Sequence, residues 1–228
     1  MKIIAHIHTD FPEKFGLPRQ SGLVEGLKGK IVFEPEYRVP EALRGIEGFS
    51  HLWLIWQFSE AVRPTWSPTV RPPRLGGNKR MGVFATRSPF RPNPIGLSCV
   101  KLEGWEMTDE GPVITVSGID IMDGTPIYDI KPYLPHADCK ADATGGFSTD
   151  AMQHSLEVVI PAELEAKIEE RLRKPLAELL AQDPRPGYAD DANRVYGFTY
   201  ATYEISFTVC DGTLTVCEID EKEDKRER

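Results

Sequence analysis

The chain of 228 residues lacks several motifs that would assign a familiar chemistry. It has no GxxxxGK[ST] loop for nucleotide phosphates and no GxGxxG turn after a strand, which argues against P-loop and Rossmann sites. The HExxH and GxSxG signatures of zinc proteases and serine hydrolases are also missing. The five histidines show no ligand spacing beyond His6-x-His8, a pair that would share one strand face. The sequence therefore predicts no metal site.

Cysteine is scarce: there are four residues and no CxxC, so neither a zinc ribbon nor a thioredoxin-type motif is supported. Cys210 and Cys217 flank Asp211-Gly212, a hairpin turn signal. A two-residue turn would place Cys210 opposite Thr213 and Cys217 opposite Ser206, out of register for a bridge. We expect buried free thiols.

Long apolar runs are missing as well. No stretch of 18 apolar residues occurs, and the apolar stretch within residues 1–6 is too short for a signal peptide. The sequence predicts a cytoplasmic protein without a membrane partner.

Acidic residues are absent from residues 61–101, although the whole chain has 27 basic and 35 acidic residues and a net charge of −8. The bulk charge alone argues against nucleic acid as a partner. The acid-free stretch carries eight cations, so the rest of the chain has a net charge of −16. Such polarisation favours docking of an anion on one face. The eight cations are Arg63, Arg71, Arg74, Lys79, Arg80, Arg87, Arg91 and Lys101.

Short β-type runs separated by Gly and Pro dominate the first two-thirds of the chain, which favours a barrel or a sandwich. The later part predicts a strand, a helix that Pro175 kinks or divides, and a closing hairpin around Asp211-Gly212. Residues 137–149 are small, polar and glycine-containing, as expected of a linker or exposed loop. The predicted strands are 30–38, 49–58, 81–86, 98–107, 113–121, 125–130, 155–160, 196–209 and 213–219, and the predicted helix is 161–182.

The run GVFATRSPFRPNPIGLS, residues 82–98, is the most unusual segment. Its prolines and glycines fix the backbone, and Arg87 and Arg91 have no carboxylate nearby in sequence. A rigid loop with cationic side chains is typical of a binding site, because its fixed backbone lowers the entropy cost of recognition. The alternative is a structural turn whose arginines pair with distant acids.

Two further segments carry polar groups. Residues 120–133, DIMDGTPIYDIKPY, bring three carboxylates to a turn, where they would bind a ligand or cap the turn. Their spacing does not match a calcium loop. Residues 183–188, DPRPGY, present Arg185 and Tyr188, which suit phosphate contact and base stacking, or else form a helix stop with a solvated charge.

Together with FGLPRQ at residues 15–20 and QDPRPGY at residues 182–188, these segments resemble the TsaA-like family, in its bacterial TrmO branch of tRNA methyltransferases. The resemblance covers nearly the whole chain. It implies a mainly β fold, a single-sheeted antiparallel β-barrel that binds S-adenosylmethionine without a Rossmann unit, followed by a small α+β C-terminal domain. It implies a barrel over residues 1–138, a linker over 139–152 and a C-terminal domain over 153–228.

The resemblance also implies roles for single residues, which the residues alone do not establish. The residues expected to bind or border the cofactor are Pro18, Arg19, Gln20, Arg87, Leu97, Asp120, Asp123, Gly124 and Thr125. For tRNA, the resemblance implies contacts from Asp183, Arg185 and Tyr188. From the charge of the acid-free stretch, we expect Arg71, Arg74, Lys79, Arg80 and Arg91 to contact tRNA as well. No catalytic base is assigned.

The implied reaction is methylation of N6 of threonylcarbamoyladenosine next to the anticodon of threonine tRNA, by a homodimer. Two alternatives stay open: a non-catalytic module that binds the cofactor or RNA with the same barrel, and a methyltransferase with a different acceptor.

Overall fold

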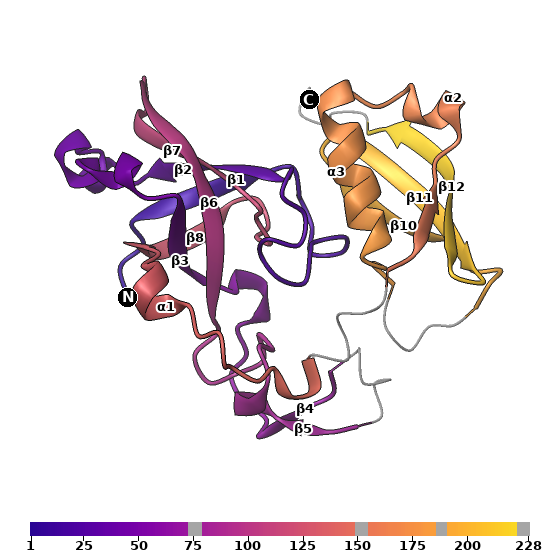
Figure 1. Cartoon of the computed structure of the whole chain (residues 1–228), viewed down its shortest axis with the longest axis horizontal. Coiled ribbons are helices and arrows are strands. Elements are labelled where there is room, and N and C mark those ends of the chain that lie inside the picture. The colour runs from indigo at the N-terminus through magenta and orange to yellow at the C-terminus, as the bar shows by residue number, and fades with distance from the viewer. Residues whose placement is uncertain (73–78, 149–154, 186–190, 223–228) are drawn as a thin grey trace.

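The structure, a computed structural model, describes residues 1–72, 79–148, 155–185 and 191–222 (Figure 1). Its N-terminal part is a closed barrel of antiparallel strands in the order β1-β2-β7-β6-β3-β8. This confirms the predicted single-sheeted barrel. The barrel strands are β1 (Ala5–Thr9), β2 (Lys28–Phe33), β3 (His51–Gln57), β6 (Ile95–Thr108), β7 (Gly111–Ser117) and β8 (Thr125–Pro132).

Alternation of side chains fills the barrel. In β3, Leu52, Leu54 and Trp56 point inward while the residues between them are only partly buried. This period of two is what a strand with one buried face requires. The long strand β6 shifts register between Leu102 and Gly104, a bulge of the kind that bends a strand and helps a sheet close on itself. Outside the barrel lie α1 (Pro135–Asp138) and a small pair of strands, β4 (Thr69–Val70) and β5 (Met81–Gly82).

The C-terminal part is a four-stranded sheet covered by a helix, as the predicted α+β region requires. The strand order is β10-β11-β12-β9, with β9 parallel to β12. Helix α3 (Glu170–Ala181) buries one leucine-rich face, and Figure 1 shows it on the side of the sheet that faces the barrel. The other elements are β9 (Glu157–Val159), α2 (Ala162–Glu165), β10 (Tyr196–Tyr200), β11 (Tyr203–Cys210) and β12 (Thr213–Glu221).

The two parts share one continuous hydrophobic core. The ring of Phe11 lies 5.2 Å from the ring of Tyr200, measured between centroids. The Ala201 N–H donates to the Asp10 carbonyl at 2.6 Å. These contacts fix the C-terminal sheet against the segment that follows β1. The boundaries 1–138, 139–152 and 153–228 remain a prediction, and residues 149–152 lie outside the described residues.

The helix differs from its prediction in where it is interrupted. Two helices form, but the break lies between Glu165 and Glu170, while Pro175 lies inside α3. The extended backbone of Glu169 lets Ile168 enter the core. The buried Pro175 ring packs against Gly26, and this packing offsets the one backbone hydrogen bond that an interior proline removes.

Four strand predictions were wrong in extent. The strands expected over residues 30–38 and 113–121 end at Phe33 and Ser117. The strand expected over residues 81–86 ends at Gly82, because Val83–Ala85 form a 3-10 turn that Thr86 closes by donating to the Val83 carbonyl. The strand expected over residues 196–209 is divided after Tyr200, where Ala201 adopts a positive φ of 52°.

The closing hairpin is confirmed, with Cys210 opposite Thr213. The expected pairing of Cys217 with Ser206 is wrong, because a bulge places Glu218 there instead. The thiols are free, but the prediction of burial was also wrong. Cys99 is half-buried and the other three cysteines, Cys139, Cys210 and Cys217, are exposed.

Gly16 offers a test of the contact between the two parts. Its φ is 91°, and an added Cβ would lie 2.3 Å from the Phe198 ring. We expect Gly16→Ala to lower the free energy of unfolding by about 3 kcal/mol through strain and overpacking. Gly22→Ala is the matched control, because Gly22 has a φ of 80° but open space around it, and should lose about 1 kcal/mol. Urea unfolding measures both, and equal losses would contradict the packing argument.

Candidate functional site

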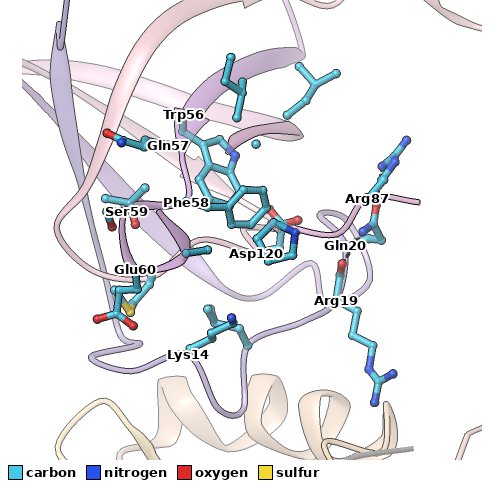
Figure 2. Close-up of a pocket in the computed structure, with 18 of the residues that line it drawn as sticks. Lys14, Arg19, Gln20, Trp56, Gln57, Phe58, Ser59, Glu60, Arg87 and Asp120 are labelled. Atoms are coloured by element: carbon cyan, nitrogen blue, oxygen red, sulfur yellow. Dashed lines mark hydrogen bonds between the residues drawn. The ribbon is translucent and has the colours of Figure 1, made fainter. Parts of the chain in front are cut away.

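A cavity of about 670 Å³ lies at one end of the barrel (Figure 2). Its volume falls within the range of about 300–1,000 Å³ that is typical of small-molecule sites. The end of β3, the start of β6 and the start of β8 meet there, together with the loops around them. The lining residues are Lys14, Leu17, Pro18, Arg19, Gln20, Trp56, Gln57, Phe58, Ser59, Glu60, Ala61, Thr86, Arg87, Pro89, Arg91, Ile95, Gly96, Leu97, Asp120, Met122 and Thr125.

One wall of the cavity is aromatic and aliphatic. The rings of Trp56 and Phe58 lie 4.3 Å apart between centroids. Gly96 lets the indole of Trp56 lie close to the backbone of β6, because an added Cβ would be 2.2 Å from the ring. Leu97 is 52% exposed although it lies in a barrel strand. This wall suits the flat or aliphatic part of a ligand.

Asp120 ends a chain of hydrogen bonds that starts at this wall. The indole Nε1 of Trp56 donates to Ser98 Oγ at 2.9 Å, and the Ser98 hydroxyl donates to Asp120 Oδ1 at 2.5 Å. Ser98 is fully buried. Because Ser98 accepts from the indole, its one proton is directed at the carboxylate, and the chain orients Asp120.

Burial raises the pKa of the Asp120 carboxyl from 3.8 to about 6, because the charged form loses contact with water. The Ser98 hydroxyl opposes this shift, as do the backbone N–H groups of Asp120 and Ser21 and the Arg87 guanidinium. The carboxyl is therefore mostly charged at pH 7 and becomes protonated about one pH unit lower.

A second series of hydrogen bonds links the cavity to the C-terminal part of the chain. Arg87 donates to Gln20 Oε1, and Gln20 Nε2 donates to the Arg19 carbonyl at 2.5 Å. The Arg19 guanidinium donates in turn to the carbonyls of Asp183 at 3.5 Å and Arg185 at 3.0 Å. Figure 2 shows Asp120 between the Trp56–Phe58 wall and the Arg87–Gln20 pair.

Most residues expected to contact the cofactor come together in this cavity. Seven line it, namely Pro18, Arg19, Gln20, Arg87, Leu97, Asp120 and Thr125. Asp123 and Gly124 do not. Asp123 Oδ1 accepts from the Thr9 N–H at 3.0 Å and lies 3.2 Å from His8 Nδ1. Of the two roles expected for the carboxylates of this turn, Asp123 therefore has the one of capping it. Asp123 also borders a smaller cavity of about 230 Å³ beside Arg171.

The residues expected to contact tRNA are dispersed. Arg91 lines the cavity, and its guanidinium donates to the Thr86 carbonyl. Arg80 donates to Thr69 Oγ1 at 3.2 Å, across the β4–β5 pair. Arg71 and Lys79 adjoin this pair. Arg74 and Tyr188 lie outside the described residues.

Asp183 and Arg185 form a two-pronged ion pair with N–O distances of 2.8 and 2.9 Å. Both side chains are largely buried. The Arg185 guanidinium is therefore held within the chain, and the backbone carbonyls of this segment accept from Arg19.

Several residues of the cavity were not predicted from the sequence. Trp56 and Phe58 were assigned only to a strand, and Ser98 to the end of the proline-rich loop. Trp56 and Phe58 at the end of that strand were a signal, because small-molecule cavities are lined mainly by apolar and aromatic side chains. Ser98 gave no signal, because its role depends on a partner 22 residues away.

In the part of the chain that the structure describes, no three His, Cys, Asp or Glu side chains gather in a way that would hold a metal ion. Within the same residues, no helix has the length and apolar composition needed to cross a membrane.

Comparison with known proteins gives matches over both parts. The model described as tRNA-methyltransferase O N-terminal domain matches residues 6–139, and that of the TrmO C-terminal domain matches residues 153–222. A protein of Escherichia coli (strain K12) named tRNA (adenine(37)-N6)-methyltransferase is 40% identical in an alignment of 225 residues, gaps included, that covers 95% of this chain and 96% of the relative.

A second relative, from Pseudomonas aeruginosa, is named putative S-adenosylmethionine-dependent methyltransferase RcsF. It is 45% identical over 202 residues, 85% of each protein. The crystal structure of TrmO from P. aeruginosa matches with a TM-score of 0.78 and 35% identity, covering 96% of this chain and 95% of that one.

Asp120 should make the protein less stable at neutral pH than an amide in its place would. A pKa raised on folding means that the stability contributed by protonated Asp120 is fully present below pH 3.8 and is lost as the pH rises through 6. We expect Asp120→Asn to raise the free energy of unfolding by about 1–3 kcal/mol at pH 8.

Urea unfolding at pH 4, 6 and 8 measures this effect. The gain should shrink to less than about 1 kcal/mol at pH 4, which is close to the pKa of 3.8 in the unfolded chain, because the penalty for ionising the buried carboxyl has then largely disappeared. A variant that is less stable at pH 8, or a difference that does not change with pH, would show that burial of the charge is not the cause.

Proposed function

Because the chain belongs to the tRNA-methyltransferase O family, we propose that it is an enzyme that transfers the methyl group of S-adenosylmethionine to N6 of adenosine 37 in a tRNA. The observation that carries this proposal is the meeting of Gln20, Arg87 and Asp120 in one cavity of suitable size. These residues come from three motifs that are far apart in sequence.

The chemistry of the cavity fits S-adenosylmethionine. That molecule combines an adenine ring, a ribose diol, an α-carboxylate, an α-ammonium and a sulfonium. The Trp56–Phe58 wall suits the ring, and a positively charged guanidinium such as Arg87 suits the carboxylate. The Glu60 carboxylate suits the positive groups. The residues we propose to contact or border the cofactor are Pro18, Arg19, Gln20, Arg87, Leu97, Asp120 and Thr125, with Asp123 and Gly124 forming the turn before β8.

When bound, the cofactor supplies an electrophilic methyl group. The contribution of the protein is chiefly positional, because displacement at a sulfonium requires the attacking nitrogen to be in line with the bond that breaks. The rigid Pro-rich loop of residues 82–98 and the fixed Trp56 ring serve this purpose.

We propose that the acceptor is N6-threonylcarbamoyladenosine in threonine tRNA. The threonylcarbamoyl group carries a carboxylate, and this cavity has cations on several of its segments. Lys14, Arg19, Arg87 and Arg91 line it. A guanidinium or ammonium group beside the cavity would therefore recognise the modified base and leave an unmodified adenosine with fewer contacts.

The tRNA backbone would lie along the acid-free stretch of residues 61–101. Trp66 and Phe84 are 52% and 72% exposed there, with ring centroids 6.0 Å apart, as in proteins that stack bases on aromatic rings. The Arg63 guanidinium lies 3.8 Å from the Phe90 ring centroid, close to the cavity. The proposed tRNA contacts are Arg71, Arg74, Lys79, Arg80, Arg91, Asp183, Arg185 and Tyr188.

We further propose that the protein acts in the cytoplasm as a homodimer, as the family resemblance implies. Sedimentation equilibrium would show one species of twice the 25.6 kDa chain mass.

The proposed activity is tested by incubating the protein with S-adenosylmethionine and threonine tRNA that does or does not carry threonylcarbamoyladenosine. We expect a mass increase of one methyl group on the modified nucleoside and none on unmodified adenosine 37. Mass spectrometry of the digested nucleosides is the measurement. Binding of both ligands without any methylation would favour the non-catalytic module, and methylation of the unmodified tRNA would remove the threonylcarbamoyl part of the proposal.

The tRNA surface is tested through salt dependence. Each phosphate contact contributes about −0.7 to −0.9 to the slope of log K against log salt. We expect the double variant Lys79→Gln/Arg80→Gln to reduce the magnitude of this slope by about 1.5. The control is Lys2→Gln/Lys30→Gln, which removes two exposed cations outside the stretch. Fluorescence anisotropy at several salt concentrations measures both, and equal slopes for the two variants would place the tRNA elsewhere.

A further inference from the structure

We propose that Asp120 is the catalytic base that takes the proton from N6 of the acceptor adenosine, and that Ser98 and Trp56 hold it in position. This inference rests on the proposed methyltransferase function and names the group that the chemistry at N6 requires.

The reaction must release one proton. As the N6 lone pair forms a bond to the methyl carbon, the carbon–sulfur bond breaks and its electron pair stays on sulfur, which becomes a neutral thioether. N6 would then carry both its new methyl group and its original hydrogen, with a positive charge. Transfer of that hydrogen to a carboxylate oxygen of Asp120 leaves neutral N6 and a carboxylic acid, and the proton passes to water when the products leave.

Asp120 has the position that this role needs. It lines the cavity, and it ends the chain Trp56–Ser98–Asp120. A carboxylate has about four acceptor directions. The Ser98 hydroxyl donates to Oδ1, and the backbone N–H groups of Asp120 and Ser21 also favour the charged form of the carboxyl. Because Asp120 lines the cavity, its carboxylate can also accept from an N–H donor that enters there.

The hydrogen-bond chain does more than replace the water that a carboxylate loses on burial, because it also fixes the orientation of the carboxylate. A surface aspartate obtains its hydrogen bonds from water, whereas this one receives a short hydrogen bond from a fully buried serine that the indole orients. Glu60 is the other carboxylate of the cavity, and it is exposed. The fixed orientation distinguishes Asp120 as the group that can be placed accurately against N6.

The charges that face Asp120 allow it to work near neutral pH. Burial raises its pKa to about 6, and the Arg87 guanidinium limits the rise. The other charged groups of the cavity come from three further segments: Lys14 and Arg19, Glu60, and Arg91. A base with a pKa close to the working pH is ionised before the reaction and still binds the proton it receives.

Asp120→Asn is the principal test, because the amide keeps an oxygen to accept from Ser98 but cannot take a proton. We expect the single-turnover rate of methylation, with both substrates saturating, to fall about 100- to 10,000-fold. Calorimetric dissociation constants for S-adenosylmethionine and for tRNA should stay within about threefold of the parent protein. The rate of the parent protein should fall below pH 6 as Asp120 is protonated. The residual rate of the variant should not show this decrease at acid pH.

The matched control is Glu103→Gln. Glu103 also accepts from a buried serine, Ser117, at 2.6 Å, but it does not line the cavity. It should leave the rate and its pH dependence unchanged.

Ser98→Ala separates a positioned base from a structural residue. The Ser98 hydrogen bond lowers the pKa of Asp120, so its loss should raise that pKa and move the acid limb of the rate profile to higher pH. Carbon-13 NMR of labelled aspartate carboxyls, in the protein without substrates, should show the same displacement for the resonance that Asp120→Asn removes. An unmoved limb and an unmoved resonance would overturn the positioning of Asp120 by Ser98.

Two further results with Asp120→Asn would overturn the proposal. If Asp120→Asn weakens S-adenosylmethionine binding tenfold or more while the saturated rate stays near that of the parent, Asp120 binds the cofactor and is not the base. A variant with the parent's rate and pH profile also overturns the proposal. If the parent protein methylates no tRNA, the proposed function fails first, and the carboxyl titration by NMR still reports whether Asp120 has the predicted pKa.

Discussion

Closure of the barrel brings the functional groups together, because β8 pairs with both β1 and β3 and so returns the loop before it to the end of β3 and the start of β6. Trp56, Ser98 and Asp120 meet there although 64 residues of sequence separate the first from the last. A closed antiparallel sheet has no free edge, so a ligand site forms at its end and in its loops. This explains how a methyl donor could be held without the glycine-rich turn of a Rossmann fold.

The same closure places a carboxylate where it is costly. Asp120 is largely removed from water, and the hydrogen bond from Ser98 recovers only part of its lost solvation. The indole that orients Ser98 is itself fixed by the absence of a side chain at Gly96. Groups that oppose stability but are held by several neighbours are typical of functional sites, and this one lies in the cavity that the family motifs line.

Much of this architecture could be predicted from local pattern. The alternation of apolar residues within 49–58 predicts the strand that forms β3. The Asp211-Gly212 turn predicts the hairpin of β11 and β12. Strand β1 was not predicted, because five residues that include His6 and His8 carry little β signal until β2 and β8 pair with them. Pro175 was expected to kink or divide the helix, because its packing against Gly26 is a tertiary contact that the local sequence does not reveal. The cavity wall and Ser98 were missed for the same reason. Arg87 and Asp120 were candidates for binding from the sequence pattern alone, and the family resemblance added their expected role at the cofactor.

The central claim is that the cavity at the end of the barrel binds the methyl donor. A crystal structure of the protein with S-adenosylhomocysteine, the stable product, tests it most directly. The account predicts the ligand between the Trp56–Phe58 wall and Arg87, in contact with the residue 120–125 turn. Ligand density in the smaller cavity beside Asp123 and Arg171, with the barrel-end cavity empty, would contradict it.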